Sequence, residues 1–330
     1  MPDPLLELRN VSKVYGDPET GVVALHDFSL TIDRDKPEIV TVAGESGSGK
    51  STLANLVLGF VRPTSGTIRF DGRDIVAASP GDHRDYYRDV QAVFQDPFSS
   101  YNPFYRVGHV FDTVIRNFGL AGDRAKARDM VEDGLNAVGL KSVDVLRKYP
   151  HQLSGGQRQR IMMARAYLVK PRLIVADEPV SMVDVSLRSS ILDVMTRLRD
   201  EDGISFIYVT HDLSTAYQVG DRIVMFYQGT LVEEGWATEV LSGPKHPYVR
   251  LLIESVPRPD PGARWEGEIQ LPEEAMQQKA RLTGCRFVPR CPYAMKACSD
   301  ELPPMHAVGT SGHRVSCVLY GPGHDAAGRS

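Results

Sequence analysis

The sequence predicts an α/β protein in which helices cover a mainly parallel sheet. Two observations support this class. Short runs of apolar and β-branched residues, typical of buried parallel strands, lie at residues 39–43, 173–176, 205–210 and 222–227. Between them, apolar side chains recur at helical spacing within residues 130–138 and 191–198. Strands that alternate with helices in this way form parallel sheets covered by helices.

The composition is that of a soluble globular chain, with 42% hydrophobic and 24% charged residues among 330. A net charge of −4 provides no electrostatic footprint for general nucleic-acid binding, so we expect no nucleic-acid partner. The longest uninterrupted apolar run covers five residues, 223–227, whereas a membrane-spanning helix needs roughly 18. The sequence does not open with a basic segment followed by an apolar one, so we expect no secretion signal.

Proline content divides the chain into two parts. Of the 22 prolines, 11 fall within residues 244–330. Pro257, Pro259 and Pro261 follow one another closely and predict a linker. We therefore expect an α/β domain at residues 1–243 and a small extension at residues 244–330, which also holds all four cysteines.

A complete phosphate-binding motif follows the first buried strand. The pattern GxxxxGK[ST] is matched by Gly44, Glu45, Ser46, Gly47, Ser48, Gly49, Lys50 and Ser51, with Thr52 next. The glycines let backbone N–H groups turn toward a phosphate, and a helix from residue 51 to about 61 directs its positive end at the same anion. We expect Lys50 to contact the β- and γ-phosphates of ATP and Ser51 to bind Mg²⁺. A chance match is the alternative, and the strand before and helix after the motif oppose it.

Two adjacent carboxylates end the strand at residues 173–176. We assign Asp177 to Mg²⁺ and Glu178 to the attacking water, as general base. Adjacent acids at a strand end are often only a solvated turn or a helix start. Their combination with the phosphate-binding motif at residues 44–51, a P-loop, favours the catalytic interpretation.

The segment Leu153–Arg160, with the sequence LSGGQRQR, resembles the signature of the ATP-binding-cassette (ABC) ATPases. Gln157 stands 20 residues before Asp177, as in that family. A serine and two glycines before a helix form a second N-terminus suited to an anion, although a bare Ser-Gly-Gly is more often a helix cap. The resemblance implies that Ser154, Gly155, Gly156 and Gln157 bind ATP held by another subunit.

Four further residues match elements of the ABC family in order. The resemblance implies that Tyr15 stacks on adenine and that Gln95 senses the γ-phosphate, Mg²⁺ and water. It implies that Asp184 contacts the opposing subunit and that His211 hydrogen-bonds the γ-phosphate. The alternatives are a core or rim tyrosine, an exposed turn glutamine and a structural histidine.

The resemblance also implies an architecture and an assembly. The fold expected is a P-loop ABC ATPase core with a mainly parallel sheet, an N-terminal antiparallel β part and a helical subdomain at about residues 97–160. That subdomain receives a coupling helix of a membrane partner in the family. The implied partners are a second, identical or paralogous ATPase subunit, two transmembrane permease subunits and an extracytoplasmic solute-binding protein. The implied location is peripheral, on the cytoplasmic face of the cell membrane.

The cysteines, at positions 285, 291, 298 and 317, leave two interpretations open: a four-thiolate metal site or unrelated buried thiols. The expected reducing compartment argues against disulfides, and the tight cysteine pairs of zinc sites are absent. Residues 246–257 and 284–294, which include His246, Pro247 and Tyr248, are similar to the C-terminal extension of the dipeptide/oligopeptide/nickel importer ATPases. Because some of those proteins bind a 4Fe–4S cluster, the resemblance implies that Cys285, Cys291, Cys298 and Cys317 hold one; free thiols or zinc are the alternatives.

The function implied is that of the ATP-hydrolysing subunit of an ABC importer for di- or oligopeptides. Residues 180–184 depart from the usual family sequence but keep Ser181 and Asp184, which leaves oligosaccharide and nickel importers as alternatives. A soluble ABC ATPase acting on DNA or ribosomes is the rival class, but a long coiled-coil insertion or a second cassette is missing. A degenerate regulatory cassette is opposed by Lys50, Glu178 and His211.

Overall fold

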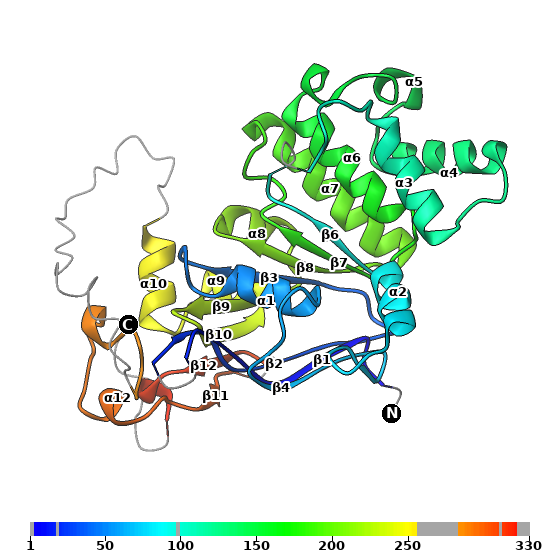
Figure 1. Ribbon diagram of the computed structural model, residues 1–330. Helices are drawn as coiled ribbons and strands as arrows, with labels where there is room; N and C mark the ends of the chain where they lie inside the picture. The colour runs from blue at the N-terminus through cyan, green and yellow to red at the C-terminus, as the bar shows by residue number, and fades with distance from the viewer. Residues whose placement is uncertain (1–2, 18–19, 97–99, 256–282, 310–311, 322–330) are drawn as a thin grey trace, which may run out of the picture.

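The expected α/β architecture is confirmed by a computed structural model of the chain, which describes residues 3–17, 20–96, 100–255, 283–309 and 312–321. One mixed sheet and one antiparallel sheet form the framework. Figure 1 shows the two sheets near one another, a group of helices at one end and the C-terminal segments at the other.

The mixed sheet has eight strands in the order β11-β12-β10-β9-β3-β8-β7-β6. Its parallel strands are β3 (Ile39–Gly44), β6 (Val90–Val93), β7 (Leu173–Asp177), β8 (Ser205–Thr210) and β9 (Arg222–Tyr227). All four strands expected from the sequence are among them. Every residue of β3 and β8 is buried, which explains their unbroken apolar pattern.

The expected N-terminal antiparallel part is also present, as a four-stranded sheet in the order β2-β1-β4-β5. Its strands are β1 (Leu6–Tyr15), β2 (Val22–Ile32), β4 (Ser65–Phe70) and β5 (Arg73–Asp74). Phe28 of this sheet and Val42 of the mixed sheet belong to one buried cluster, which also contains Leu53 of α1 (Lys50–Val57). Helix α1 therefore packs in the core between the sheets. It ends at Val57 rather than near residue 61, because a turn follows in which Gly59 has φ +71°.

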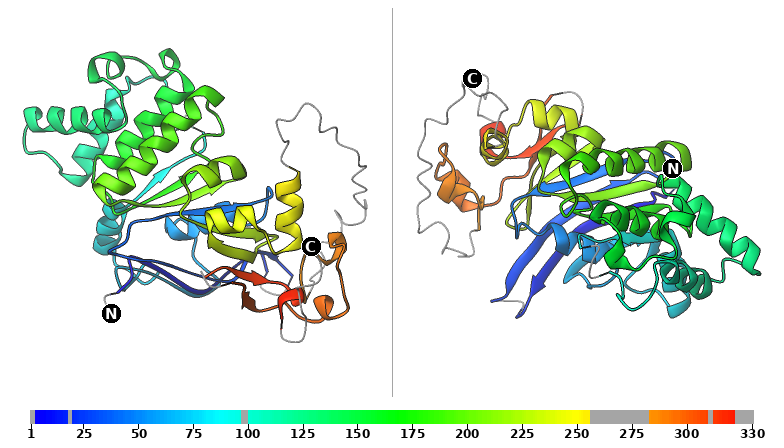
Figure 2. Two further views of the ribbon diagram at one scale, coloured as in Figure 1. Left: turned by 180° about the vertical axis from the view of Figure 1, so that it is seen from behind. Right: turned by 90° about the horizontal axis from the view of Figure 1, so that it is seen from above.

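Helices gather beyond the β6 edge of the mixed sheet (Figures 1 and 2). They are α3 (Gly108–Phe118), α4 (Arg124–Ala137), α5 (Ser142–Val145), the 3₁₀ turn η1 (Pro150–Gln152), α6 (Gly155–Tyr167) and α7 (Val185–Asp202). Phe111, Leu135 and Ile161 come from three of these helices and share one buried cluster with Phe206 of β8. Helix α6 continues to Tyr167, so residue 160, where we expected the helical subdomain to end, lies inside a helix.

Three further helices pack against strands of the mixed sheet: α2 (Pro80–Asp89), α8 (Leu213–Val219) and α9 (Ala237–Ser242). Helix α2 begins with a complete capping box, in which Ser79 and Asp82 each satisfy a backbone N–H of the other. Helix α8 begins similarly, because the Asp212 carboxylate accepts hydrogen bonds from the backbone of Ser214 and Thr215.

The C-terminal extension is built into the main fold. Its elements are α10 (Pro247–Glu254), η2 (Val288–Arg290), α12 (Ala297–Asp300), β11 (Met305–Ala307), β12 (Arg314–Ser316) and η3 (Val318–Tyr320). Strand β12 pairs with β10 (Thr230–Trp236) and so extends the mixed sheet. Phe287 and Tyr248 are buried in one cluster with Tyr227 of β9. The division at residue 243 stays a prediction, and the proline-rich linker at Pro257, Pro259 and Pro261 lies outside the described residues.

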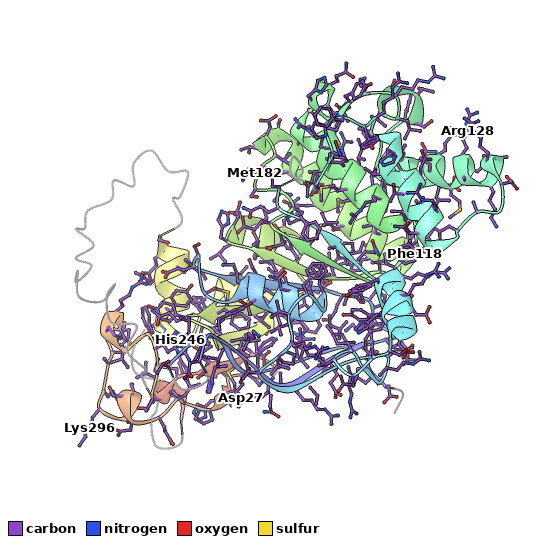
Figure 3. All side chains as sticks on the ribbon, viewed as in Figure 1. Asp27, Phe118, Arg128, Met182, His246 and Lys296 are labelled. Atoms are coloured by element: carbon purple, nitrogen blue, oxygen red, sulfur yellow. The ribbon has the colours of Figure 1, made fainter. Side chains whose placement is uncertain are left out.

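Figure 3 places His246 where the extension meets the sheets and Lys296 at the outer edge of the extension. Within the described ranges, every helix is too short or too polar to cross a membrane.

Candidate active site

The residues predicted to act on nucleotide follow four neighbouring parallel strands. The P-loop follows β3, Gln95 follows β6, Glu178 follows β7 and His211 follows β8. Since the carboxyl ends of parallel strands lie along one edge of a sheet, the topology brings these segments together.

Lys50 is the buried centre of the P-loop, with only 5% of its surface exposed. Its Nζ donates hydrogen bonds of 2.8 Å each to the backbone oxygens of Gly44 and Glu45. Burial lowers the pKa of Lys50, and the nearby carboxylates of Glu178, Asp177 and Glu45 partly oppose this effect. The ammonium group is thus preoriented by the loop's own carbonyl oxygens, beside the space a phosphate would enter.

Two glycines of the P-loop are required by close backbone approach. A Cβ on Gly44 (φ +146°) would lie 2.2 Å from the Phe226 oxygen, and one on Gly49 (φ +105°) would lie 2.3 Å from the Ala24 oxygen. At Gly47 (φ +76°) a Cβ would meet nothing within 4 Å. The loop is therefore held at its two ends and open at its tip. The other predicted positions here are Ser46 at the exposed tip, buried Ser48, and Ser51 and Thr52 in the first turn of α1.

Two of the three residues predicted to contact magnesium, Ser51 and Asp177, meet between α1 and β7; the third is Gln95. Ser51 forms a side-chain hydrogen bond with Asp177, which lowers the pKa of that carboxyl, but burial and then the charge of Glu178 raise it more strongly. A hydroxyl and a carboxylate are hard oxygen donors of the kind that Mg²⁺ prefers, one or two of them being enough when phosphates and waters complete the shell. The pair therefore fits a magnesium ion.

Glu178 joins two other predicted residues. Gln95 Nε2 donates to Glu178 Oε2 at 2.9 Å, and His211 Nδ1 lies 2.8 Å from Glu178 Oε1. Glu178 also has φ +45°, in the left-handed region that non-glycine residues seldom occupy. Strain at this position is offset by the hydrogen bond from its own N–H to the Val209 oxygen, at 2.9 Å. The result is a carboxylate fixed by an amide and an imidazole from two neighbouring strand ends.

The signature segment begins α6. Ser154 and Gln157 form a capping box, with the Gln157 N–H donating to Ser154 Oγ at 3.2 Å and the Ser154 N–H donating to Gln157 Oε1 at 3.1 Å. A Cβ on Gly156 would lie 2.9 Å from Leu187 of α7, so this glycine also serves helix packing. Gly155 lies beside it, against the Met182 oxygen. In the part of the chain that the structure describes, no hydrogen bond or ion pair connects residues 154–157 with the P-loop.

The last two predicted nucleotide contacts are exposed. Tyr15 ends β1 with 43% of its surface exposed, and the Lys13 ammonium lies 5.1 Å from its ring centroid. Asp184 precedes α7 without a side-chain capping hydrogen bond and is exposed. Both side chains are thus available for contacts from outside the chain.

Sequence analysis missed two residues that hold the P-loop from the extension. Arg290 forms an ion pair with Glu45 at 3.1 Å, and Tyr248 Oη accepts the Glu45 N–H at 2.8 Å. Arg290 is separated from Glu45 by 245 positions. Local sequence patterns carry no signal for a contact between residues so far apart in the sequence. Both residues do lie in the two segments that resemble the C-terminal extension of the importer ATPases.

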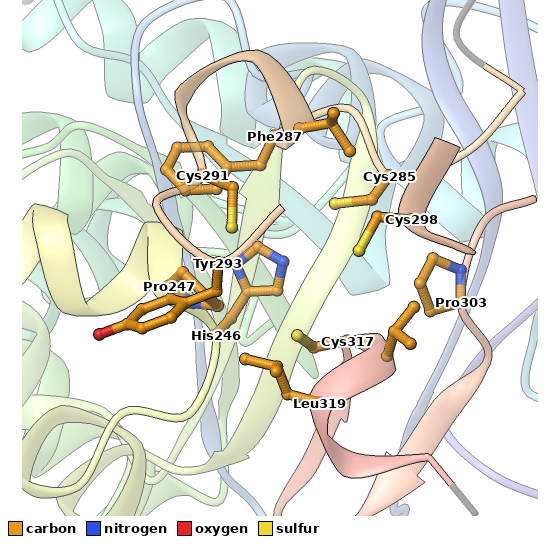
Figure 4. A pocket seen from close by; sticks show the side chains of 12 residues that line it. His246, Pro247, Cys285, Phe287, Cys291, Tyr293, Cys298, Pro303, Cys317 and Leu319 are labelled. Carbon is orange, nitrogen blue, oxygen red and sulfur yellow. The ribbon is translucent and has the colours of Figure 1, made fainter. Parts of the chain in front are cut away.

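All four cysteines line one pocket in the extension, together with His246 (Figure 4). Burial raises the pKa of Cys285 and Cys291 and raises that of Cys317 to about 12. His246 Nδ1 accepts the Tyr248 N–H, and burial lowers the pKa of the imidazole to about 3. Thiols that converge in this way fit a four-thiolate site in number and kind. Across the described ranges, however, no three potential ligands have the spacing that holds a metal ion.

Comparison with known proteins connects both parts of the chain to transport. Residues 25–181 match the ABC transporter family, and residues 232–298 match the oligopeptide/dipeptide transporter C-terminal region. A probable peptide ABC transporter ATP-binding protein of Sinorhizobium fredii is 38% identical, covering 98% of this chain and 92% of that protein. The oligopeptide transport ATP-binding protein OppF of Escherichia coli is 37% identical, covering 96% of this chain and 93% of that protein.

A solved structure matches the α/β part. The dimeric ATP-binding cassette MJ0796, in a post-hydrolysis state bound to ADP and Pi, superposes with a TM-score of 0.63 at 30% identity. The alignment covers 70% of this chain and 98% of that one.

The two ends of the P-loop should tolerate substitution less well than its tip. We expect Gly44→Ala to lower the free energy of unfolding by more than about 3 kcal/mol, since its Cβ would overlap a backbone oxygen that cannot move away. Gly47→Ala, the matched control, should cost only about 1–2 kcal/mol, because it adds left-handed strain without a clash. Denaturant unfolding of both variants measures the difference, and equal losses would contradict this account.

Proposed function

The chain belongs to the family of ABC transporter ATP-binding proteins that serve oligopeptide and dipeptide transport, and from this membership we propose that it hydrolyses ATP to drive import of di- or oligopeptides. The observation that carries the proposal is the Glu178 carboxylate, which Gln95 and His211 hold beside the P-loop. A carboxylate fixed in this way is suited to accept a proton from an attacking water.

The residues around Glu178 divide the work of hydrolysis. The P-loop backbone and Lys50 bind and orient the phosphates, while Ser51 and Asp177 would hold Mg²⁺, which when bound neutralises charge on the β- and γ-phosphate oxygens. Gln95 and His211 orient Glu178 and contact the water and the γ-phosphate. Most of the catalysis then consists of positioning and electrostatic stabilisation.

We assign residues 1–243 as the nucleotide-binding domain, with Tyr15 stacking on adenine, and residues 244–330 as its extension. The signature residues 154–157 and Asp184 would complete the site of a second subunit, identical or paralogous. Ser154 and Asp184 are exposed, and within the described residues no hydrogen bond connects residues 154–157 with this chain's own P-loop. Both observations support a role in trans. The MJ0796 cassette is dimeric in its structure with ADP and Pi, which supports the pairing of two cassettes. ATP binding would close this dimer and hydrolysis would open it.

The partners follow from the family. We propose that the dimer docks peripherally on two transmembrane permease subunits, on the cytoplasmic face of the cell membrane, and that an extracytoplasmic protein delivers the solute. Both similar transport proteins are described as peptide or oligopeptide ATP-binding proteins. Peptides are therefore favoured over the nickel and oligosaccharide alternatives.

Glu178→Gln should abolish turnover while nucleotide binding persists. The amide keeps the shape of the side chain and one of its two acceptor oxygens but cannot accept the proton, so kcat should fall about 100- to 10,000-fold. Glu201→Gln, at an exposed position of α7, is the matched control and should keep full activity. Steady-state ATPase assays and nucleotide binding measure the two effects; near-normal turnover of Glu178→Gln would refute the assignment of the base.

The transport role predicts a membrane complex. Affinity purification of the full-length chain from mild detergent extracts of its native membrane should recover a permease in stoichiometric amounts. Co-sedimentation with ribosomes or DNA, without a permease, would instead establish the soluble ABC class.

We also propose that Cys285, Cys291, Cys298 and Cys317 hold a 4Fe–4S cluster. Convergence of the four side chains on one pocket supports it. Since burial raises the pKa of Cys285, Cys291 and Cys317, binding would require these thiols to lose their protons to the solvent. When bound, the cluster would crosslink segments of an extension that has little core of its own.

The cluster has a direct chemical test. Full-length protein purified without oxygen should contain iron and acid-labile sulfide in equal amounts, and both should be lost when Cys291 and Cys298 are replaced by Ser. Absence of iron and sulfide from the anaerobic wild-type protein would eliminate the cluster, and stoichiometric zinc would establish the alternative metal.

A further inference from the structure

We propose that Arg290 of the cysteine-bearing extension is a positioning residue of the ATP site, which acts through Glu45 of the P-loop. The inference rests on the proposed ATPase function. It makes the extension part of the nucleotide site, so that events at the cysteine pocket change the affinity for ATP.

The contact is a two-pronged ion pair. Arg290 Nη1 lies 3.1 Å from both carboxylate oxygens of Glu45, and Nη2 lies 3.1 Å from Oε1. The guanidinium also packs near the rings of Tyr227 and Phe287, 5.8 and 5.6 Å from their centroids. A planar guanidinium that is both stacked and multiply hydrogen-bonded has little freedom to leave its partner.

The extension holds the backbone of Glu45 as well as its side chain. Tyr248, fully buried in α10, accepts the Glu45 N–H at 2.8 Å. On the other side, the Glu45 carbonyl oxygen accepts a hydrogen bond from Lys50 Nζ at 2.8 Å. One residue of the P-loop therefore connects the extension to the phosphate-binding lysine.

The ion pair also matters electrostatically. Burial lowers the pKa of Lys50, and the Glu45 carboxylate is near enough to oppose this effect in part, after Glu178 and Asp177. An uncompensated carboxylate at this position would repel the phosphates of ATP. Arg290 supplies the compensating charge, and it does so from a segment remote in the sequence.

Arg290 is itself held by the cysteine-bearing loop. It ends the 3₁₀ turn η2 and directly precedes Cys291, whose N–H donates to the Val288 oxygen at 3.2 Å. At the start of the loop, the Cys285 N–H donates to the Cys298 oxygen at 2.8 Å. A change that loosens the cysteine pocket would thus loosen the turn that presents the arginine.

The experiment measures binding of the Mg²⁺ complex of a non-hydrolysable ATP analogue to the full-length chain. Arg290→Ala should raise the Kd about 5- to 10-fold, the range for a partly exposed, hydrogen-bonded charge pair, and should raise the KM of hydrolysis in parallel while kcat at saturating ATP stays unchanged. Arg290→Lys keeps the charge but not the fork and should lie between. Lys296→Ala removes an exposed charge from the same extension and should change neither constant.

A second variant tests whether Arg290 acts through Glu45. In a Glu45→Gln background, which lacks the carboxylate, Arg290→Ala should raise the Kd less than 2-fold. The inference is overturned if Arg290→Ala binds as tightly as wild type, or if it weakens binding equally in both backgrounds. Failure of the wild-type protein to bind the analogue would instead overturn the proposed function.

The link to the cysteines has its own readout. Cys291→Ser should raise the Kd in the wild-type chain but add nothing to the effect of Arg290→Ala. An equal further loss in the Arg290→Ala chain would show that the cysteine pocket acts on the site by another route and would overturn this link.

Discussion

The Glu178 carboxylate is the point on which the active site depends, because it ties together segments that no single element could align. Gln95 and His211 reach it from the ends of β6 and β8, on either side of its own strand β7. The polypeptide continues from Gln95 toward the helical group and returns through the signature helix α6 to β7. The helical group thus lies, in sequence, between two residues that a hydrogen bond joins, Gln95 and Glu178. The backbone of Glu178 is also left-handed, a conformation that a non-glycine residue keeps only where the surrounding structure stabilises it.

Local sequence patterns predicted four of the five parallel strands and missed β6. The strands at Ile39 and Leu173 are continuous apolar runs because both faces of the sheet are covered, and the P-loop and signature have spacings set by the chemistry of phosphate binding. The end of α1 was placed too late, since apolar residues continue past the turn at Gly59. Contacts between segments distant in the sequence could not be predicted from local patterns. Examples are the pairing of β12 with β10 and the ion pair between Arg290 and Glu45.

Proline content and the cysteines drew attention to the extension as a separate piece. In the structure it is attached to one end of the main body, through the pairing of β12 with β10 and through a shared buried cluster. Phe287 packs on Tyr227 and Tyr248. Tyr248 in turn accepts a hydrogen bond from the N–H of Glu45 in the P-loop. The extension therefore contributes to the wall that supports the phosphate site, and Cys285 and Cys291 pack against the same cluster of side chains.

Glu233 in β10 shows how far this integration goes. Its side chain is fully buried, and it accepts hydrogen bonds from the N–H groups of Lys245 and His246 and from His313 Nε2, at 2.8, 2.7 and 2.7 Å. All three donors come after residue 243. A chain shortened to the α/β domain would expose the edge of β10 and leave the Glu233 carboxylate without these three donors. The carboxylate would then take up water, and the free edge of β10 could pair with another molecule. The extension thus supplies three hydrogen-bond donors to a buried carboxylate that belongs to a strand of the main sheet.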